Sequence, residues 1–217
     1  NMWHSDVMWR MDPSLGSILL AKTVPALGGD TLFADMVAAY QGLSDELKTK
    51  INGLMAINSG SANGSKEKAR QRLEQEGSSA EELDAFDQKY AHIPIPVHPV
   101  VRSHPDTGEP AIYVNRAFTR QIADMEKQES DKLLELLWAQ AAVPEYQCRF
   151  KWAPGSVAFW DNRAAQHYAS SDYWPERREM DRVTISGERP YYTRDNGEKL
   201  TSYADDQALL TELGMPT

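Results

Sequence analysis

The sequence predicts a mainly β fold, a sandwich or barrel decorated with inserted helices. Three observations support this prediction. Short stretches rich in apolar and β-branched residues recur along the chain, turns containing Pro and Gly separate them, and helical patterns are inserted between some of them. No G-x-G-x-x-G or G-K-[ST] sequence occurs, so the nucleotide-binding folds that carry those motifs are not indicated.

Length and composition favour one domain spanning residues 1–217. Hydrophobic residues make up 41% and charged residues 25% of the chain, as in ordinary globular proteins. The formal net charge of −9 argues against a nucleic-acid-binding surface, although it permits a local basic site for a small anion. The sequence contains no run of 18 apolar residues, so no membrane-spanning helix is expected. The chain begins abruptly at Asn1, so we expect that an N-terminal portion is missing.

The cysteine content limits the chemistry further. Cys148 is the only cysteine, which excludes an intrachain disulfide and a zinc site built from several cysteines. A single thiol fits the reducing conditions of the cytoplasm.

The first part of the chain contains five expected elements. In order, they are a strand at 17–24, a turn at 25–30, helices at 34–43 and 44–51, and a strand at 53–59. The turn contains Gly28 and Gly29, which adopt positive φ without steric cost. Ser44 and Asp45 suit the start of the second helix.

The middle of the chain changes character twice. Residues 62–90 are strongly polar and charged, which predicts a solvated insertion with one or two exposed helices; a lid over a site is the functional alternative. Residues 93–115 return to β character, and their prolines favour edge strands or extended segments. Within them, PDTGEP predicts the turn of a hairpin.

The last part of the chain combines one amphipathic helix with further strands. Apolar residues clustered between 133 and 138 predict a helix over 129–142 that begins near Ser130 or Asp131. Strands are expected at 146–152, 157–160 and 182–186. Residues 193–217 predict a polar, loosely held tail that ends in a short helix.

His4 and Asp6 are the first candidates for chemistry. On a strand, residues two apart point to the same face, so an imidazole nitrogen and a carboxylate oxygen can bind one metal ion. A His-x-Asp tripeptide is common by chance, so a third ligand is needed before a site is indicated.

His167 is the best candidate for that third ligand. It follows a strand and a turn in a segment that gathers aromatic residues, Asn162 and four arginines, FWDNRAAQHYASSDYWPERREMDRVTIS. The other histidines, His92, His98 and His104, lie in or beside the proline-rich stretch and are expected to be structural or solvent-facing.

Two histidines and one carboxylate form the ligand set of the non-haem Fe(II) oxygenases. A 2-oxo acid can fill two of the remaining positions on the metal, and dioxygen a third. The distal carboxylate of such a co-substrate needs a positive partner, and arginine offers a planar, bidentate fork. Arg178, eleven residues after His167, is the candidate fork, and Thr31 is the candidate hydroxyl donor.

With these residues in place, the sequence resembles the taurine dioxygenase and 2,4-dichlorophenoxyacetate dioxygenase (TauD/TfdA) family of Fe(II)/2-oxoglutarate-dependent oxygenases. The resemblance rests on WHSD, LGGDTLFADMVAAY, HPVVRSHPDTGEPAIYVNRAFT and FWDNRAAQHYASSDYWPERREMDRVTI. It runs in the same order from residue 3 to about residue 192, and covers residues 62–90 and the tail least. It implies a double-stranded β-helix, that is, a jelly-roll, cupin-like core.

The resemblance also implies roles for the metal and co-substrate residues. His4, Asp6 and His167 would bind Fe(II). Thr31 and Arg178 would hold the distal carboxylate of 2-oxoglutarate.

Further residues match positions around the primary substrate in relatives. Arg182 falls where relatives bind the substrate's anionic group; a salt bridge to the neighbouring Asp181 or Glu179 is the alternative. Val7 and Phe118 match positions that line the substrate, and plain core packing is the alternative for both. Trp160 and Asn162 would support the site by packing and hydrogen bonding.

The implied reaction couples oxidative decarboxylation of 2-oxoglutarate, with O2, to hydroxylation of a small organic anion. An alkylsulfonate such as taurine is the first choice, with release of sulfite and an aldehyde; an aryloxyalkanoate or an alkyl sulfate ester is the alternative. A non-catalytic metal-binding sandwich protein and a zinc hydrolase are the competing classes. The Thr31 and Arg178 pair argues against the hydrolase, which needs no anchor for an oxo acid. The retained Asp6 argues against a halogenase.

Partner expectations follow from the same resemblance. Relatives are commonly dimers or tetramers, so a homo-oligomer is expected, acting on a small anionic substrate. Neither nucleic acid nor a membrane is expected as a partner.

Overall fold

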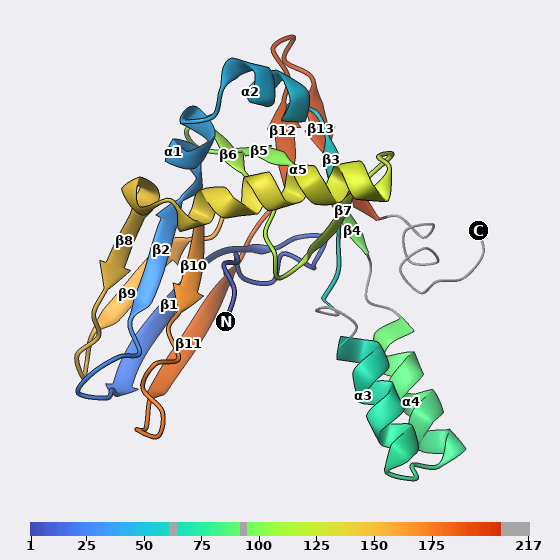
Figure 1. The fold of residues 1–217 in the computed structure, drawn as a ribbon, viewed down its shortest axis with the longest axis vertical. Coiled ribbons are helices and arrows are strands. Elements are labelled where there is room, and N and C mark those ends of the chain that lie inside the picture. Colours follow the sequence, from blue (N-terminus) through green and yellow to red (C-terminus); the bar gives the residue numbers. More distant parts are fainter. Residues whose placement is uncertain (61–64, 92–94, 205–217) are drawn as a thin grey trace.

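A computed structural model of the chain describes residues 1–60, 65–91 and 95–204. Two three-stranded antiparallel sheets face each other as in a jelly roll at the lower left of Figure 1, and the remaining strands and most helices lie above them or to their right. The prediction of a mainly β fold with inserted helices is confirmed. Within the described ranges, no helix combines the length and the apolar character needed to cross a bilayer.

The first of these two sheets has the order β11-β1-β9. Its strands are β1 (Ser14–Thr23), β9 (Val157–Asp161) and β11 (Glu179–Ser186). Ser17 lies opposite Trp160, and Leu19 lies opposite Arg182. Because side chains alternate along a strand, Ser17, Trp160 and Arg182 project from the same face. This is the face that carries the candidate site.

The second of these two sheets has the order β10-β2-β8. Its strands are β2 (Thr31–Asp35), β8 (Gln147–Phe150) and β10 (Ala165–Ala169). Phe33 pairs with His167, and Thr31 pairs with Ala169, so all of these side chains share one face. The ring of Phe33 packs on Trp160 of the first sheet with centroids 5.3 Å apart, which shows that the two faces meet.

The remaining strands form a four-stranded sheet and two hairpins. The sheet has the order β14-β4-β3-β7, with strands β14 (Tyr203–Ala204), β4 (Pro96–Pro99), β3 (Met55–Asn58) and β7 (Thr119–Ile122). The first hairpin pairs β5 (Val101–Ser103) with β6 (Pro110–Ile112). The second pairs β12 (Tyr191–Thr193) with β13 (Lys199–Thr201). The hairpin predicted at PDTGEP is confirmed by the pairing of β5 with β6. The prediction of edge strands is wrong for β4, which lies between β14 and β3. Its prolines stand at its two ends, so Val97 and His98 keep their N–H groups for pairing.

Part of the predicted tail is ordered. The prediction of a loosely held segment over 193–217 is wrong for residues 193–204, which contribute to β12, β13 and β14. Ser202 is buried, and its hydroxyl donates to Pro190 O at 2.9 Å. These strands pair with each other and with the distant β4, so the local sequence alone did not mark them. The short helix predicted at the end of the tail lies outside the described residues.

Two short helices follow β2. They are α1 (Met36–Gln41) and α2 (Asp45–Ile51), and both were predicted with slightly wider bounds. Asp35 ends β2 and caps α1, because its carboxylate accepts the N–H groups of Val37 and Ala38. The predicted start of α2 is confirmed, since Ser44 Oγ accepts the Leu47 N–H at 3.2 Å.

The long helix α5 (Lys127–Ala139) covers the core, and two 3-10 turns, η2 (Gln140–Ala142) and η3 (Pro144–Tyr146), lead from it to β8. Leu133, Leu134 and Leu137 are buried at helical spacing, as the apolar pattern predicts. The predicted start near Ser130 or Asp131 is wrong. Ser130 lies inside the helix, and its hydroxyl accepts the N–H of Ile122 in β7 at 2.8 Å, so it joins the helix to the sheet.

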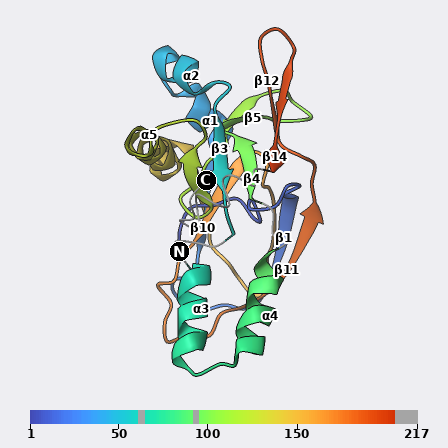
Figure 2. The ribbon, with the colours of Figure 1, turned by 90° about the vertical axis from the view of Figure 1, so that its right-hand side faces the viewer.

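The predicted polar insertion contains two antiparallel helices, α3 (Ser65–Gln75) and α4 (Ala80–Ala91), as Figure 2 shows. An ion pair between Arg70 and Asp87, 2.9 Å from Nε to Oδ2, joins them. Whether this hairpin acts as a lid stays a prediction.

Candidate metal centre

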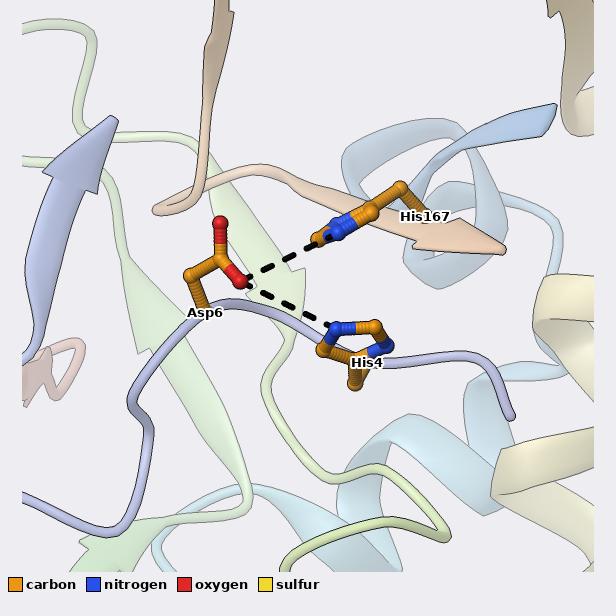
Figure 3. A group of neighbouring side chains, drawn as sticks. All are labelled: His4, Asp6 and His167. Atoms are coloured by element: carbon orange, nitrogen blue, oxygen red, sulfur yellow. Dashed lines mark ion pairs between the residues drawn. The ribbon is translucent and has the colours of Figure 1, made fainter. Parts of the chain in front are cut away.

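Three side chains that the sequence singles out, His4, Asp6 and His167, meet in the structure (Figure 3). One ligand atom from each lies within 4.8 Å of the others. Asp6 Oδ1 is 3.8 Å from His4 Nε2 and 3.9 Å from His167 Nε2. These separations are too long for hydrogen bonds. The three atoms therefore surround a point at which one cation can contact all of them.

The two histidines are held together by their backbones. The His4 N–H donates to His167 O at 3.1 Å, and the His167 N–H donates to His4 O at 2.8 Å. This isolated antiparallel bridge brings the two rings to a centroid distance of 4.2 Å.

The prediction that His4 and Asp6 share one face of a strand is wrong. The bridge involves His4 alone, Asp6 begins a turn, and Val7 has a φ of 50°. The turn directs the Asp6 carboxylate toward both imidazoles.

Asp6 is buried and its orientation is fixed by two polar neighbours. Its Oδ2 accepts from Ser17 Oγ at 2.5 Å, and its backbone N–H donates to Asn162 Oδ1 at 3.2 Å. Asn162 Nδ2 donates to Ser17 Oγ, and Trp160 Nε1 donates to Asn162 Oδ1. These bonds leave Oδ1 facing the histidines. Ser17 was not predicted, because a single Ser on an apolar strand carries no motif.

The hydrogen bonds and burial of the histidines suit metal binding. His4 Nδ1 lies 2.9 Å from Met2 O; when it donates there, Nε2 keeps its lone pair toward Asp6. Burial lowers the pKa of His167 well below its ordinary value, and the neighbouring His4 lowers it further, so its ring is neutral. Its Nδ1 is buried and has no hydrogen-bond partner among the described residues.

Arg182 contacts the same carboxylate. Its Nη1 donates to Asp6 Oδ1 at 3.1 Å, the oxygen that also faces both histidines, and about half of its side chain is exposed (52%). The alternative salt bridge to Asp181 or Glu179 is not formed; both of those carboxylates pair with Lys22.

Val7 and Phe118 adjoin the candidate metal centre. The Phe118 ring stands edge-on to His4 with centroids 6.0 Å apart, and Val7 directly follows Asp6. Both residues are partly exposed, which distinguishes them from the fully buried core.

Thr31 and Arg178 both contact the indole of Trp152. Trp152 Nε1 donates to Thr31 Oγ1 at 3.0 Å, and Arg178 Cζ lies 5.9 Å from the ring centroid. Arg178 Nε donates to Gly29 O at 3.1 Å, but its Nη2 is buried without a hydrogen-bond partner in the described part of the chain. Burial lowers the pKa of Arg178. A half-buried guanidinium with one buried, unpaired nitrogen is suited to binding an anion.

Two of the remaining histidines are structural, as predicted. His98 is fully buried, with Nε2 2.9 Å from Met8 O and Nδ1 2.7 Å from Ser202 Oγ; burial lowers its pKa to about 4. His104 Nε2 contacts Asp161 Oδ2 at 3.1 Å. His92 lies outside the described residues.

Comparison with protein families gives one match that spans most of the chain. The model described as "Taurine catabolism dioxygenase TauD, TfdA family" matches residues 1–184.

Curated relatives resemble the chain over most of its own length. An alpha-ketoglutarate-dependent sulfonate dioxygenase of Saccharomyces cerevisiae is 37% identical over 190 residues, which cover 87% of this chain and 42% of that protein. An alpha-ketoglutarate-dependent sulfate ester dioxygenase of Pseudomonas putida is 35% identical over 191 residues, covering 88% of this chain and 61% of that protein.

Among solved structures, a taurine dioxygenase from Burkholderia xenovorans superposes with a TM-score of 0.74 at 34% identity. The alignment covers 94% of this chain and 62% of that one. The chain thus spans about two fifths to three fifths of the length of these three proteins.

Proposed function

The chain belongs to the TauD/TfdA family, and from this premise we propose that it is an Fe(II)- and 2-oxoglutarate-dependent dioxygenase that acts on a small organic anion. The observation that supports this most strongly is the presence of two features in one fold. They are the His4, Asp6 and His167 group and the partly unpaired guanidinium of Arg178. A simple metal-binding module needs the first feature and has no use for the second.

The donor set suits Fe(II). Two neutral imidazoles and one carboxylate are the protein ligands of non-haem Fe(II) oxygenases, and three ligands leave positions for a co-substrate. When bound, Fe(II) supplies the activation of O2 for oxidative decarboxylation of 2-oxoglutarate and hydroxylation of a C–H bond. The chain holds the ligands in place: the backbone bridge fixes His4 and His167, and Ser17 with Asn162 fixes Asp6.

In this proposal, Thr31 and Arg178 bind the distal carboxylate of 2-oxoglutarate. Thr31 pairs with Ala169, and Phe33, two residues further along β2, pairs with His167. Thr31 and His167 therefore lie on the same face of this sheet, at neighbouring positions along the strands. A co-substrate lying along this face has its chelating end near the histidines and its other end near Arg178. The ring centroids of Tyr173 and Trp152 lie 6.0 and 5.9 Å from the guanidinium carbon and add cation–π contacts to it.

Arg182 binds the anionic group of the primary substrate. Its half-exposed guanidinium sits beside Asp6, and Val7 and Phe118 provide apolar surface next to it. Arg182 donates to the Asp6 oxygen that would also bind the metal, so its guanidinium would become available to a substrate anion when the metal is bound. The names of the yeast and Burkholderia relatives favour an alkylsulfonate such as taurine, with release of sulfite and an aldehyde. The Pseudomonas relative supports the alternative of an alkyl sulfate ester, and an aryloxyalkanoate offers the same anionic handle.

The test is a substrate panel. Purified protein with Fe(II), 2-oxoglutarate and O2 is given taurine, other alkylsulfonates, alkyl sulfates and aryloxyalkanoates, and succinate is measured beside sulfite, sulfate or phenol. The proposal predicts that one class gives succinate and its released group in equal amounts. The protein without added substrate serves as the control. Metal binding without substrate-dependent succinate on the whole panel would favour the non-catalytic sandwich protein.

Two properties of the whole protein belong to the same proposal. We propose a homo-oligomer, a dimer or tetramer, which light scattering of the purified protein tests. We also propose a cytoplasmic location, where the exposed thiol of Cys148 stays reduced.

A further inference from the structure

We propose that Trp152 is a positioning residue that prepares both donors, Thr31 and Arg178, for the distal carboxylate of 2-oxoglutarate. The inference rests on the proposed function. It concerns a side chain that no motif in the sequence marks, and it follows from the two contacts that one indole makes.

The indole is held in one orientation. Trp152 follows the end of β8 and is 6% exposed. Phe150, the last residue of β8, packs edge-on against it with centroids 4.7 Å apart. A side chain packed in this way can transmit a fixed orientation to whatever it contacts.

The direction of the Trp152–Thr31 hydrogen bond sets the polarity of the hydroxyl. An indole N–H only donates, so Thr31 Oγ1 must accept. The hydroxyl hydrogen of Thr31 is therefore directed away from Trp152. Thr31 is 2% exposed, so this hydrogen faces the interior of the jelly roll rather than bulk water. A carboxylate oxygen can only accept hydrogen bonds, and it is the partner that this arrangement suits.

The face of the same indole orients Arg178. The guanidinium carbon of Arg178 lies 5.9 Å from the ring centroid of Trp152 and 6.0 Å from that of Tyr173. Its Nε donates to Gly29 O, which fixes one edge of the fork. The other edge, with Nη2, is buried and unpaired among the described residues. An anion therefore meets the guanidinium at that free edge.

Gly29 allows this close approach. It has a φ of 72°, and a Cβ at this position would lie 3.1 Å from Arg178 Cδ. Asp172 accepts the Gly29 N–H at 2.8 Å and holds the loop in place. Gly29 and the Trp152 indole thus both contact Arg178. Of these two, the indole also contacts Thr31.

Equilibrium binding tests this role without turnover. Mn(II)-loaded protein is titrated with 2-oxoglutarate and, separately, with oxalate, which chelates the metal but has no distal carboxylate. Trp152→Phe keeps an aromatic ring and removes the N–H, so the Kd of 2-oxoglutarate should rise about tenfold. The Kd of oxalate should stay unchanged. Trp152→Leu, which also removes the ring face under Arg178, should raise the Kd of 2-oxoglutarate by about a further threefold.

A double-mutant cycle separates positioning from general packing. Thr31→Val removes the hydroxyl at nearly constant shape. Because the indole N–H acts through that hydroxyl, Trp152→Phe added to Thr31→Val should raise the Kd no further than Thr31→Val alone. Trp152→His, which retains a ring N–H, should bind 2-oxoglutarate within about threefold of the unsubstituted protein, and it keeps the test available if the Phe variant does not fold.

The outcomes distinguish this inference from the proposed function. An unsubstituted protein that binds oxalate but not 2-oxoglutarate would contradict the proposed function, and with it the inference. An unsubstituted protein that binds 2-oxoglutarate while Trp152→Phe leaves its Kd unchanged would overturn the inference alone. Equal losses for oxalate and 2-oxoglutarate, or full additivity of the two substitutions, would assign Trp152 to packing and overturn it too.

Discussion

Replacing Arg178 by Met should separate ligand binding from folding stability. In the proposed complex, the guanidinium gives the distal carboxylate of 2-oxoglutarate two charge-assisted hydrogen bonds. Each such bond contributes about 1.5–3 kcal/mol, so the lower value predicts a loss of about 3 kcal/mol. That loss corresponds to a rise of about a hundredfold in the Kd of 2-oxoglutarate.

The same substitution should leave the ligand-free protein nearly as stable. Arg178 has a buried Nη2 without a partner among the described residues, and burial lowers the pKa of its guanidinium, so the charge is poorly accommodated before an anion binds. Met keeps an aliphatic chain against Gly29 and Trp152. The variant loses one hydrogen bond to Gly29 O, worth about 1 kcal/mol, and this loss is offset by removal of the desolvated charge.

Thermal melting and calorimetry measure both effects. The melting temperature of the ligand-free Arg178→Met variant should lie within a few degrees of the unsubstituted protein, while the stabilisation given by 2-oxoglutarate with Mn(II) should disappear. Arg177→Met is the matched control, because Arg177 is exposed and pairs with Glu179 at 2.6 Å. Unchanged 2-oxoglutarate affinity in the Arg178 variant, or an equal loss in the Arg177 variant, would refute this reasoning.

Three further substitutions address metal binding, pH dependence and the core. Arg182→Gln removes a cation from Asp6 Oδ1 and should tighten Mn(II) binding by about threefold to tenfold in a titration without 2-oxoglutarate; weaker binding would contradict the proposed competition. Burial lowers the pKa of His98 from 6.5 to about 4, so between pH 4 and pH 6.5 the unfolded chain binds more protons than the folded protein. The contribution of His98 to the free energy of unfolding should therefore be complete above pH 6.5 and fall by about 3 kcal/mol on acidification to pH 4. The His98→Gln variant should lack this part of the pH dependence in denaturant titrations, and an identical slope would refute the assignment. Leu134→Ala, at a fully buried position of α5, should cost about 2–5 kcal/mol in urea unfolding, and a loss below 1 kcal/mol would show that the helix is not packed as described.

The sequence predicted those elements of the fold that are determined by residues close together in the chain, such as helix caps, turns and apolar spacing. Ser44 caps α2, the PDTGEP turn joins β5 to β6, and the apolar spacing of α5 buries three leucines. The strands β2 and β10 were not predicted, although β10 carries His167. The sequence of β10, AQHYA, has no β-branched residue, and its strand conformation comes from pairing with β2 and with His4.

The site shows the same division between local and long-range causes. Residue types and order pointed to His4, Asp6 and His167, and the structure brings these three together. The expected strand geometry at His4 and Asp6 was wrong, because a turn replaces the strand after His4. Ser17 and Trp152 act only through contacts with residues far away in the sequence, so nothing in their local sequence revealed them.

The central claim is that His4, Asp6 and His167 hold an Fe(II) ion that binds 2-oxoglutarate. Its most direct test is the visible spectrum of the protein with Fe(II) under anaerobic conditions, before and after addition of 2-oxoglutarate. We expect a weak charge-transfer band that needs both Fe(II) and 2-oxoglutarate. It should be absent from Asp6→Ala and should need far more 2-oxoglutarate in Arg178→Met. A spectrum that 2-oxoglutarate leaves unchanged, in a protein shown to be folded and loaded with iron, would contradict it.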